Sequence, residues 1–120
     1  MISLLKLQKN IYASLIAAPL LMSKISGVYN HVSKDTKFPY IHIGNMSASD
    51  ASTKTTKAVH VTSRIHIYSR EQGTKEVLEL LEIVKETCNY MQFMACLVRQ
   101  NKDGITYQVE LKFRMYIEGV

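Results

Sequence analysis

The C-terminal part of the chain contains the stretch Ile105-Thr-Tyr-Gln-Val-Glu-Leu-Lys-Phe-Arg-Met-Tyr-Ile117. Apolar and polar side chains alternate along it, and a period of two places them on opposite faces of a β-sheet. The stretch therefore predicts a strand with one buried face and one solvated face. At about 3.3 Å per residue it extends for roughly 40 Å, which is longer than most strands. A small domain does not easily cover that length alone, which indicates a scaffold that pairs with something else.

A second alternating stretch runs from Val59 to Ser69, with His, Arg and Tyr on its outward positions. Shorter apolar segments predict further strands at Val28–Val32, Phe38–Ile43 and Phe93–Gln100. Apolar residues at helical spacing predict two main helices, one on Leu4, Leu7, Ile11 and Leu15 and the other on Val77, Leu81, Val84, Cys88 and Met91. This order predicts an α+β fold, a largely antiparallel sheet of about five strands with the two main helices packed on one face.

The composition is that of one domain, 1–120, with 47% apolar residues. The formal net charge is +5 and the pI is near 9.3, but the basic residues are spread along the chain without a cluster. The acidic residues are concentrated in the second helix, between Glu71 and Glu86. We interpret these carboxylates as a solvated helix face rather than as a docking site for a basic patch of a neighbouring copy.

The segment from Asn45 to Lys57 interrupts the strand pattern with Ser, Thr and Lys and has almost nothing to bury. A connection of this length without its own periodicity is usually functional or disordered. Because it joins two predicted strands, we expect an extended arm or a mobile loop at 45–57.

The two cysteines, Cys88 and Cys96, both lie in apolar segments, so we expect each to be a buried, reduced thiol. The most apolar run, Ile11–Met22, is interrupted by Pro19, has no cleavage site after it and is too short to span a bilayer. We therefore expect a protein that is made and folded in a reducing cytoplasm and has no membrane partner.

No set of residues predicts catalysis, a cofactor or a metal. The glycines are too scattered for a phosphate-binding loop, and there is no Gly-x-Ser-x-Gly elbow. His60 and His66 share a strand face but lie roughly 20 Å apart. His42 has the outward parity that would allow it to neighbour one of them across the sheet. No cysteine or carboxylate pair completes a zinc site, so we expect a protein that is not an enzyme.

A basic surface with interleaved tyrosines is the alternative that the composition leaves open, since single-stranded nucleic acids stack on such surfaces. We favour an ordinary sheet surface, and a small basic nucleic-acid-binding protein is the competing class. The residues concerned are Lys34, Lys37, Lys54, Lys57, Arg64, Lys112 and Arg114, with Tyr40, Tyr68 and Tyr116.

Short motifs follow one another along nearly the whole chain: Leu7-Gln-Lys-Asn-Ile-Tyr12, Gly27-Val-Tyr-Asn-His-Val32, Phe38-Pro-Tyr-Ile-His-Ile-Gly44, Ser52-Thr-Lys-Thr-Thr56, His66-Ile-Tyr-Ser-Arg70, Asp103-Gly-Ile-Thr-Tyr107 and Leu111-Lys-Phe-Arg114. In order and spacing this series resembles the tail-completion (tail-terminator, head–tail joining) family of long-tailed phages and gene transfer agents. The segment from Met91 to Lys102 departs from the family, whose members carry a further strand and turn there.

The resemblance implies a structural virion protein without catalysis. Family members form hexameric rings that cap the tail tube and join it to the head connector, and DNA only passes through the channel. The implied partners are further copies of the chain, the tail tube protein and the head-completion or connector protein. The implied location is the head–tail interface of the virion and, during assembly, the cytoplasm of the bacterial host. Another virion adaptor, such as a head-completion protein, is a further possibility.

Our hypothesis assigns protein interaction to two groups of residues. The polar segment with Ser52, Thr53, Lys54, Thr55 and Thr56 is expected to reach a neighbouring copy or the tube, and the alternative is a merely disordered loop. Tyr68 and Arg70 lie at the end of the predicted strand Val59–Ser69. We expect them to order that corner of the fold rather than to face a partner. Asp103 and Gly104 are interpreted as structural turn residues.

Overall fold

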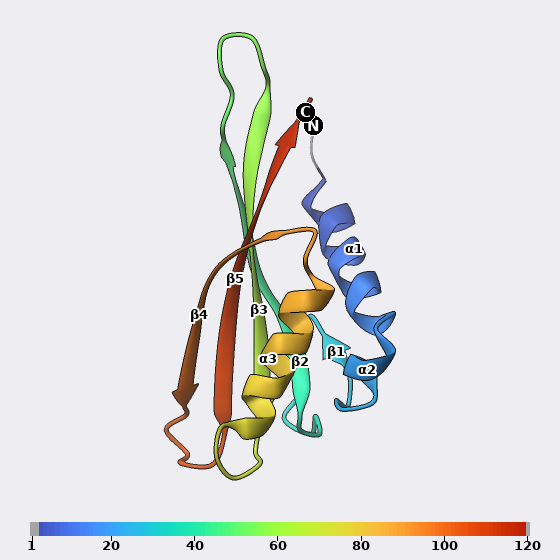
Figure 1. Ribbon diagram of the computed structural model, residues 1–120, viewed down its shortest axis with the longest axis vertical. Helices are drawn as coiled ribbons and strands as arrows, with labels where there is room; N and C mark the ends of the chain where they lie inside the picture. The colour runs from blue at the N-terminus through green and yellow to red at the C-terminus, as the bar shows by residue number, and fades with distance from the viewer. Residues whose placement is uncertain (1–2, 120) are drawn as a thin grey trace.

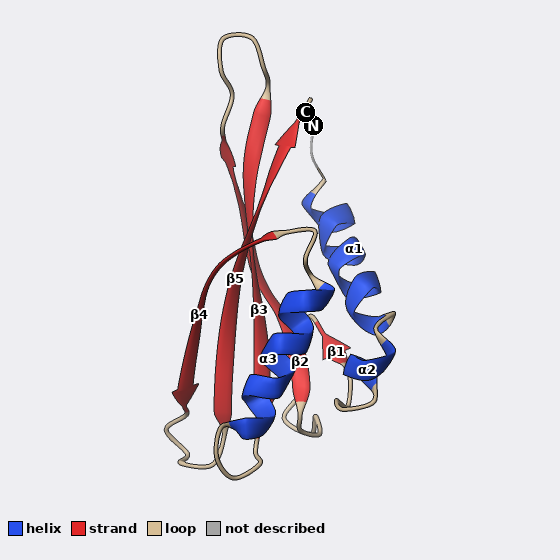
Figure 2. Cartoon of the chain, viewed as in Figure 1, coloured by secondary structure: helices blue, strands red, loops and turns tan. Residues whose placement is uncertain are grey.

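A computed structural model describes residues 3–119 and shows one β-sheet with helices on one of its faces (Figure 1). The strand order is β1-β2-β3-β5-β4; β1 is parallel to β2 and the other neighbouring pairs are antiparallel. The elements are α1 (Leu4–Ile16), α2 (Pro19–Met22), β1 (Val28–Tyr29), β2 (Tyr40–Asp50), β3 (Ala58–Ser69), α3 (Lys75–Thr87), β4 (Gln92–Gln100) and β5 (Tyr107–Glu118). The predicted α+β class is confirmed (Figure 2).

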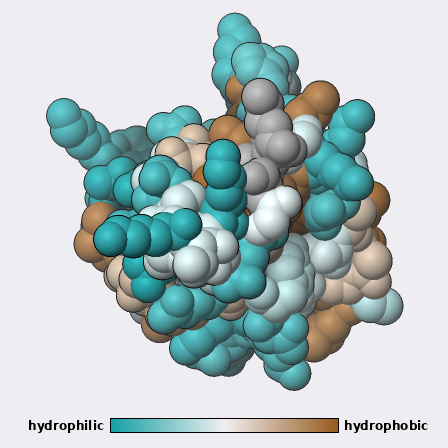
Figure 3. Space-filling model, turned by 90° about the horizontal axis from the view of Figure 1, so that it is seen from above, coloured by the Kyte–Doolittle hydropathy of each residue, from teal (hydrophilic) through white to brown (hydrophobic). Residues whose placement is uncertain are grey.

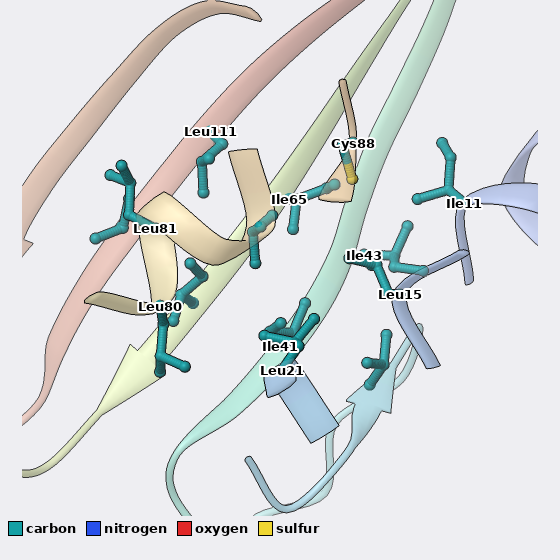
Figure 4. Close-up of a cluster of buried hydrophobic side chains, with 14 of the residues drawn as sticks. Ile11, Leu15, Leu21, Ile41, Ile43, Ile65, Leu80, Leu81, Cys88 and Leu111 are labelled. Carbon is teal, nitrogen blue, oxygen red and sulfur yellow. The ribbon is translucent and has the colours of Figure 1, made fainter. Parts of the chain in front are cut away.

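The core lies between the helices and one face of the sheet (Figure 4). β3 and β5 contribute the apolar positions that their alternation predicts, and Ile65, Ile67, Leu111 and Phe113 are each 0% exposed. Burial of apolar surface is the main stabilising term in such a fold. The buried helical residues that pack against this face are Ile11, Leu15, Leu21, Val77, Leu80, Leu81 and Val84.

The sheet is longer than its helical cover. β3 and β5 have 12 residues each and pair over their whole length, from Ala58↔Glu118 to Ser69↔Tyr107. The molecule measures 52 × 26 × 25 Å, and its radius of gyration is 15.4 Å, whereas a compact chain of this length has about 14 Å. The additional length comes from the β2–β3 hairpin, which projects beyond the helices (Figure 1).

β2 continues to Asp50, so the predicted end of this strand at Ile43 is wrong. After a register shift between Ile43 and Met46, the residues up to Asp50 pair with β3. Their side chains are small or polar and mostly exposed, so they carry no alternating apolar signal. Of the segment predicted as an arm or loop, residues 45–50 are therefore strand, and residues 51–57 form the connection to β3.

β5 begins at Tyr107, and the predicted burial of Ile105 is wrong: Ile105 is 58% exposed, whereas Thr106 is 3% exposed. The cause is the Asp103 carboxylate, which accepts hydrogen bonds from the N–H groups of Ile105 and Thr106, both at 2.9 Å, and from the Thr106 hydroxyl at 2.7 Å. These bonds hold the residues in a turn and lower the pKa of Asp103 to about 2, with those from Thr106 contributing most. Gly104 has a φ of +74°, which glycine adopts readily.

β4 is an edge strand, and the predicted burial of Cys96 is wrong because this side chain is exposed. Cys88 is buried as predicted, and burial raises the pKa of its thiol to about 11. Hydrophobic composition alone does not distinguish an edge strand from a central one. The segment in which the resemblance implied a further strand and turn forms this edge, and a turn at residues 101–106 leads directly from β4 into β5.

Candidate functional site

The base of the β2–β3 loop is closed by hydrogen bonds to the first of the predicted interaction residues, Ser52. Its hydroxyl donates to Asp50 Oδ1 at 2.6 Å, and its Oγ accepts the N–H of Ala58 at 3.1 Å. The Ser52 N–H also donates to Asp50 Oδ1 at 3.1 Å. Both bonds to the carboxylate favour its charged form and lower the pKa of Asp50. Ser52 therefore shapes the loop and leaves little hydroxyl capacity for a partner.

The tip of the loop is organised around Thr53. Its N–H donates to the Thr56 carbonyl at 2.8 Å, and its Oγ1 accepts the N–H of Thr56 at 3.1 Å. Lys54 and Thr55 lie between these two residues, and both are exposed. A partner that approaches the tip would meet the Lys54 and Thr55 side chains first.

Tyr68 lies at the other end of β3, in a row of aromatic rings on the sheet face opposite the helices. It stacks on Tyr40, with 5.0 Å between ring centroids and 25° between ring planes. Tyr40 also packs against Phe38 at 5.0 Å and against Tyr29 at 6.1 Å. Burial raises the pKa of both Tyr40 and Tyr68. The Tyr68 ring therefore joins β3 to the start of β2.

Arg70 contacts two segments distant from it in the sequence. Its Nε donates to Thr106 Oγ1 at 3.2 Å, and its guanidinium carbon lies 4.3 Å from the centroid of the Phe38 ring. It thus links the end of β3 to the turn before β5 and to the segment before β2. These contacts connect three segments at this corner of the fold.

The two groups of predicted interaction residues do not come together. The loop residues and the pair Tyr68 and Arg70 lie at opposite ends of β3 (Figure 1), which for 12 residues corresponds to about 40 Å. They therefore belong to two different regions of the molecule.

A polar row crosses the open face of the sheet, and the sequence indicated only part of it. His42 pairs with His66 across β2 and β3, as the parity of His42 allows, and their rings stack at 5.6 Å. Gln108 on β5 continues the row, with 3.2 Å between its Nε2 and His66 Nδ1. Arg64 and Glu110 form an ion pair with 2.9 Å between Nε and Oε1. The cross-strand register, which the sequence does not give, assembles this row.

His66 lies directly over Gly44 on the neighbouring strand. A Cβ added to Gly44 would lie 2.6 Å from His66 Nε2 and 3.1 Å from the carbonyl oxygen of Arg64, closer than side chains normally approach. Burial is the main cause that lowers the pKa of His66, and the Glu110 carboxylate opposes it. Burial therefore favours the neutral form of this ring.

The residues of the possible basic surface come together only in part. Arg64 lies opposite Lys112 across β3 and β5, and Arg114 and Tyr116 follow on the same face. Glu110 pairs with Arg64 on this face and offsets its charge. The lysines of the loops before and after β2 lie at the two ends of that strand, and Tyr40 is 8% exposed, so it has little surface on which a base can stack.

Other kinds of site have little support between residues 3 and 119. Within that range no group of three or more His, Cys, Asp or Glu side chains is placed to hold a metal ion. No helix in the same part of the chain is long and apolar enough to cross a bilayer. The end of the molecule that carries the loop has a mainly hydrophilic surface with separate hydrophobic patches (Figure 3).

Comparison with known proteins gives consistent results at the level of sequence and of structure. The sequence model of the family described as "Tail completion protein gp17" matches residues 9–118. No curated protein matches the sequence significantly. Among solved structures, a chain of the virion of a native gene transfer agent particle is similar with a TM-score of 0.80 and 20% identity, over 91% of this chain and 92% of that one.

A second solved structure, the gp17 protein of bacteriophage SPP1, is similar with a TM-score of 0.60 and 22% identity, over 91% of this chain and 88% of that one. At these identities the two structures show a shared fold. The match to the family model extends from α1 to the end of β5 and so includes the whole sheet. On this evidence the chain belongs to the tail completion protein gp17 family.

Proposed function

We propose that this chain is a structural subunit, without catalytic activity, of a ring that caps the tail tube of a phage or prophage-like element and joins it to the head connector. The observation that carries the proposal is the family match over residues 9–118. The ring is proposed as a hexamer through which DNA passes without sequence-specific contact. The protein would act at the head–tail interface of the virion, after synthesis and assembly in the cytoplasm of the host.

The shape of the molecule supports a role in assembly. In a ring, one surface of each subunit binds a different surface of the next subunit. Repetition of this head-to-tail contact with the same rotation closes the ring. The sheet offers two distinct edges, one at β1–β2 and one at β4. The projecting hairpin offers a third surface, at one end of the molecule. The longest dimension of the molecule is 52 Å.

The loop at the end of the hairpin is proposed to contact a neighbouring copy or the tail tube. Its backbone is ordered by the Ser52 and Thr53 hydrogen bonds, so the exposed Lys54 and Thr55 are presented on a defined turn. Presentation of a preformed turn reduces the entropy lost on binding. Tyr68 and Arg70 are proposed to stabilise the opposite corner rather than to contact a partner.

The test is removal of the gene from the element that encodes this chain, followed by electron microscopy of the particles. Loss of a tail cap should give overlong or uncapped tubes together with DNA-filled heads that carry no tails. A plasmid copy of the gene should restore joined particles. Normal numbers of joined particles without the gene would contradict the proposal.

The same images discriminate between the cap and the alternative head-completion adaptor. Loss of an adaptor that belongs to the head should leave tails of normal length and should affect the heads instead. Tail length is therefore the deciding measurement between these two positions in the virion.

A further inference from the structure

The outer edge of β4 lacks the features that normally prevent strands from pairing between molecules. Within the described residues β4 pairs only with β5, and its nine residues contain no proline and one charged side chain, Arg99. Met94 is 38% exposed and Leu97 is 53% exposed. Natural edge strands are usually protected by charges, proline or a covering element. The register shift between Phe93 and Ala95 and the charge of Arg99 are the protective features of this strand.

The hydrogen-bond pattern identifies which backbone groups of β4 are free. The Asn101 N–H donates to the Thr106 carbonyl at 2.7 Å. Hydrogen-bonded pairs alternate along an antiparallel ladder. Every second residue before Asn101, that is Arg99 and Leu97, therefore uses its backbone groups to bond to β5. The residues whose backbone N–H and C=O groups point away from β5 are Cys96, Val98 and Gln100.

The opposite edge of the sheet is also open. β1 pairs only with Ile41 and His42, so β2 has no neighbour on that side from Ile43 to Asp50 among residues 3–119. The Ala51 N–H donates to the Ala58 carbonyl at 2.9 Å. The same alternation therefore leaves Met46, Ala48 and Asp50 as the β2 residues with outward backbone groups.

The two edges are complementary in length, direction and facing. The free part of β2 has eight residues, from Ile43 to Asp50, and β4 has nine. β4 runs antiparallel to β2, because three antiparallel pairings separate them. By register Ala48 shares a face with Val61, and Cys96 shares a face with Leu111. Both side chains therefore lie on the helix-covered face, so pairing the two edges would keep the helices of successive copies on one side.

A cavity of about 280 Å³ lies between α1 and β1 and reaches Ile43, the first residue of the free part of β2. Its lining is mixed: Tyr12, Val28, Tyr29 and Ile43 are apolar or aromatic, and Gln8, Lys9, Asn30 and His31 are polar. The complementarity of the two edges therefore lies in their backbone groups and not in this cavity.

We propose that β4 of one copy pairs antiparallel with the outer edge of β2 in a second copy, as the head-to-tail contact of the ring. This interface deepens the proposed function and rests on it. Each copy contributes one β4 edge and one β2 edge, so a closed ring leaves neither edge free. The sheet then becomes continuous from subunit to subunit.

The first test compares Cys96→Pro with Cys96→Ala. Proline removes the outward N–H and leaves the hydrogen bonds to β5 intact, whereas alanine keeps the N–H and removes only the thiol. Both genes are expressed in the deletion strain, and joined particles are counted. We expect at least tenfold fewer joined particles with Cys96→Pro than with Cys96→Ala. Equal numbers would overturn the interface but would leave the proposed function standing.

The second test does not depend on a proline being tolerated. The exposed β2 residues are replaced one at a time, as Ser47→Cys, Ala48→Cys and Ser49→Cys, so that each copy has a thiol near each edge. Assembled particles are oxidised and separated on a non-reducing gel. Pairing of the edges predicts a ladder of covalent multimers for at least one variant, and its loss when Cys96→Ser is added.

The control places the new thiol on the solvated face of α3, as Glu82→Cys, where no ladder is expected. A ladder of equal strength in this control, or no ladder from any β2 variant in particles that contain the protein, would overturn the interface. If the deletion strain already makes normal particles, the proposed function fails instead, so the two failures are distinguishable.

Discussion

The same two strands, β3 and β5, lie in two different environments along their length. Beneath the helices, Ile65 and Leu111 are completely buried. Toward the hairpin end the alternation continues, but Ile117 and its cross-strand partner Val59, on the same face, are only half-buried. His60 Nδ1 is buried there without a hydrogen-bond partner in the described part of the chain. We call these two regions the covered region (β3 residues 63–69 with β5 residues 107–113) and the hairpin region (β2 residues 46–50, loop 51–57, β3 residues 58–62 and β5 residues 114–118).

One alternating pattern is therefore buried to different degrees along the same two strands. In the covered region the apolar face meets helices and stabilises the fold. In the hairpin region Val61 on the same face is still only 3% exposed, whereas Val59 and Ile117, nearer the loop, are half-buried. Substitutions in the two regions should therefore have different effects on stability.

The largest expected effect separates the regions by stability. Phe113→Ala, in the covered region, should lower the free energy of unfolding by about 3–5 kcal/mol because it leaves a cavity under the helices. Ile117→Ala, four residues away in the hairpin region, should cost about 1 kcal/mol or less, since its side chain is only half-buried. Urea denaturation followed by circular dichroism measures both. Similar costs for the two variants would break the distinction between the regions.

At the boundary between the regions, Gly44→Ala should lower the free energy of unfolding by about 1–3 kcal/mol, because the new Cβ would clash with His66. Shortening the partner, as His66→Ala, should relieve much of this cost. A double-mutant cycle on the two positions should therefore give a coupling of at least about 1 kcal/mol. Additive effects would show that the His66 ring moves aside without cost.

At the far corner of the covered region, Arg70→Ala should cost about 1–2 kcal/mol, because it removes the hydrogen bond to Thr106 and the contact with the Phe38 ring. Joining of heads and tails should persist in this variant if Arg70 only orders the corner. If the variant has wild-type stability but no longer joins heads and tails, Arg70 belongs to the interaction surface instead.

The pH dependence of stability should expose the turn that precedes β5. Hydrogen bonds lower the pKa of Asp103 to about 2 from an ordinary value of 3.8. The unfolded chain therefore binds this proton more tightly than the folded chain does, so the contribution is complete above about pH 4 and is lost as the pH falls toward 2. Denaturation midpoints between pH 5 and 2 should decline more steeply for the wild type than for Asp103→Asn. Parallel profiles would contradict the assignment.

The smallest expected effect on stability belongs to the loop of the hairpin region. Replacing residues 52–57 with Asn-Gly gives a two-residue turn between the paired residues Ala51 and Ala58. The free energy of unfolding should change by about 1 kcal/mol or less, since the loop buries little, whereas head–tail joining should be lost. Thermal unfolding and particle counts are the two readouts. Normal joining by a folded variant would remove the loop from the interaction surface.

The sequence by itself determined the fold class, because the periods of two and 3.6 are properties of the side chains alone. The parity of Ile65, Ile67, Leu111 and Phe113 follows from alternation, and the stripes of α1 and α3 follow from helical spacing. The ordered motifs also indicated the family to which the chain belongs. Each of these signals is local, and none depends on which strand lies beside which.

Only the tertiary structure decided the features that depend on neighbours. Cys96 is exposed because β4 has only one neighbouring strand among the described residues. β2 continues to Asp50 because its backbone pairs with β3, although its side chains there show no apolar alternation. Ile105 faces solvent because the Asp103 carboxylate ends the alternation. The free edges of β2 and β4 likewise exist only once strand order is set, because an unpaired edge is a property of the sheet and not of any residue.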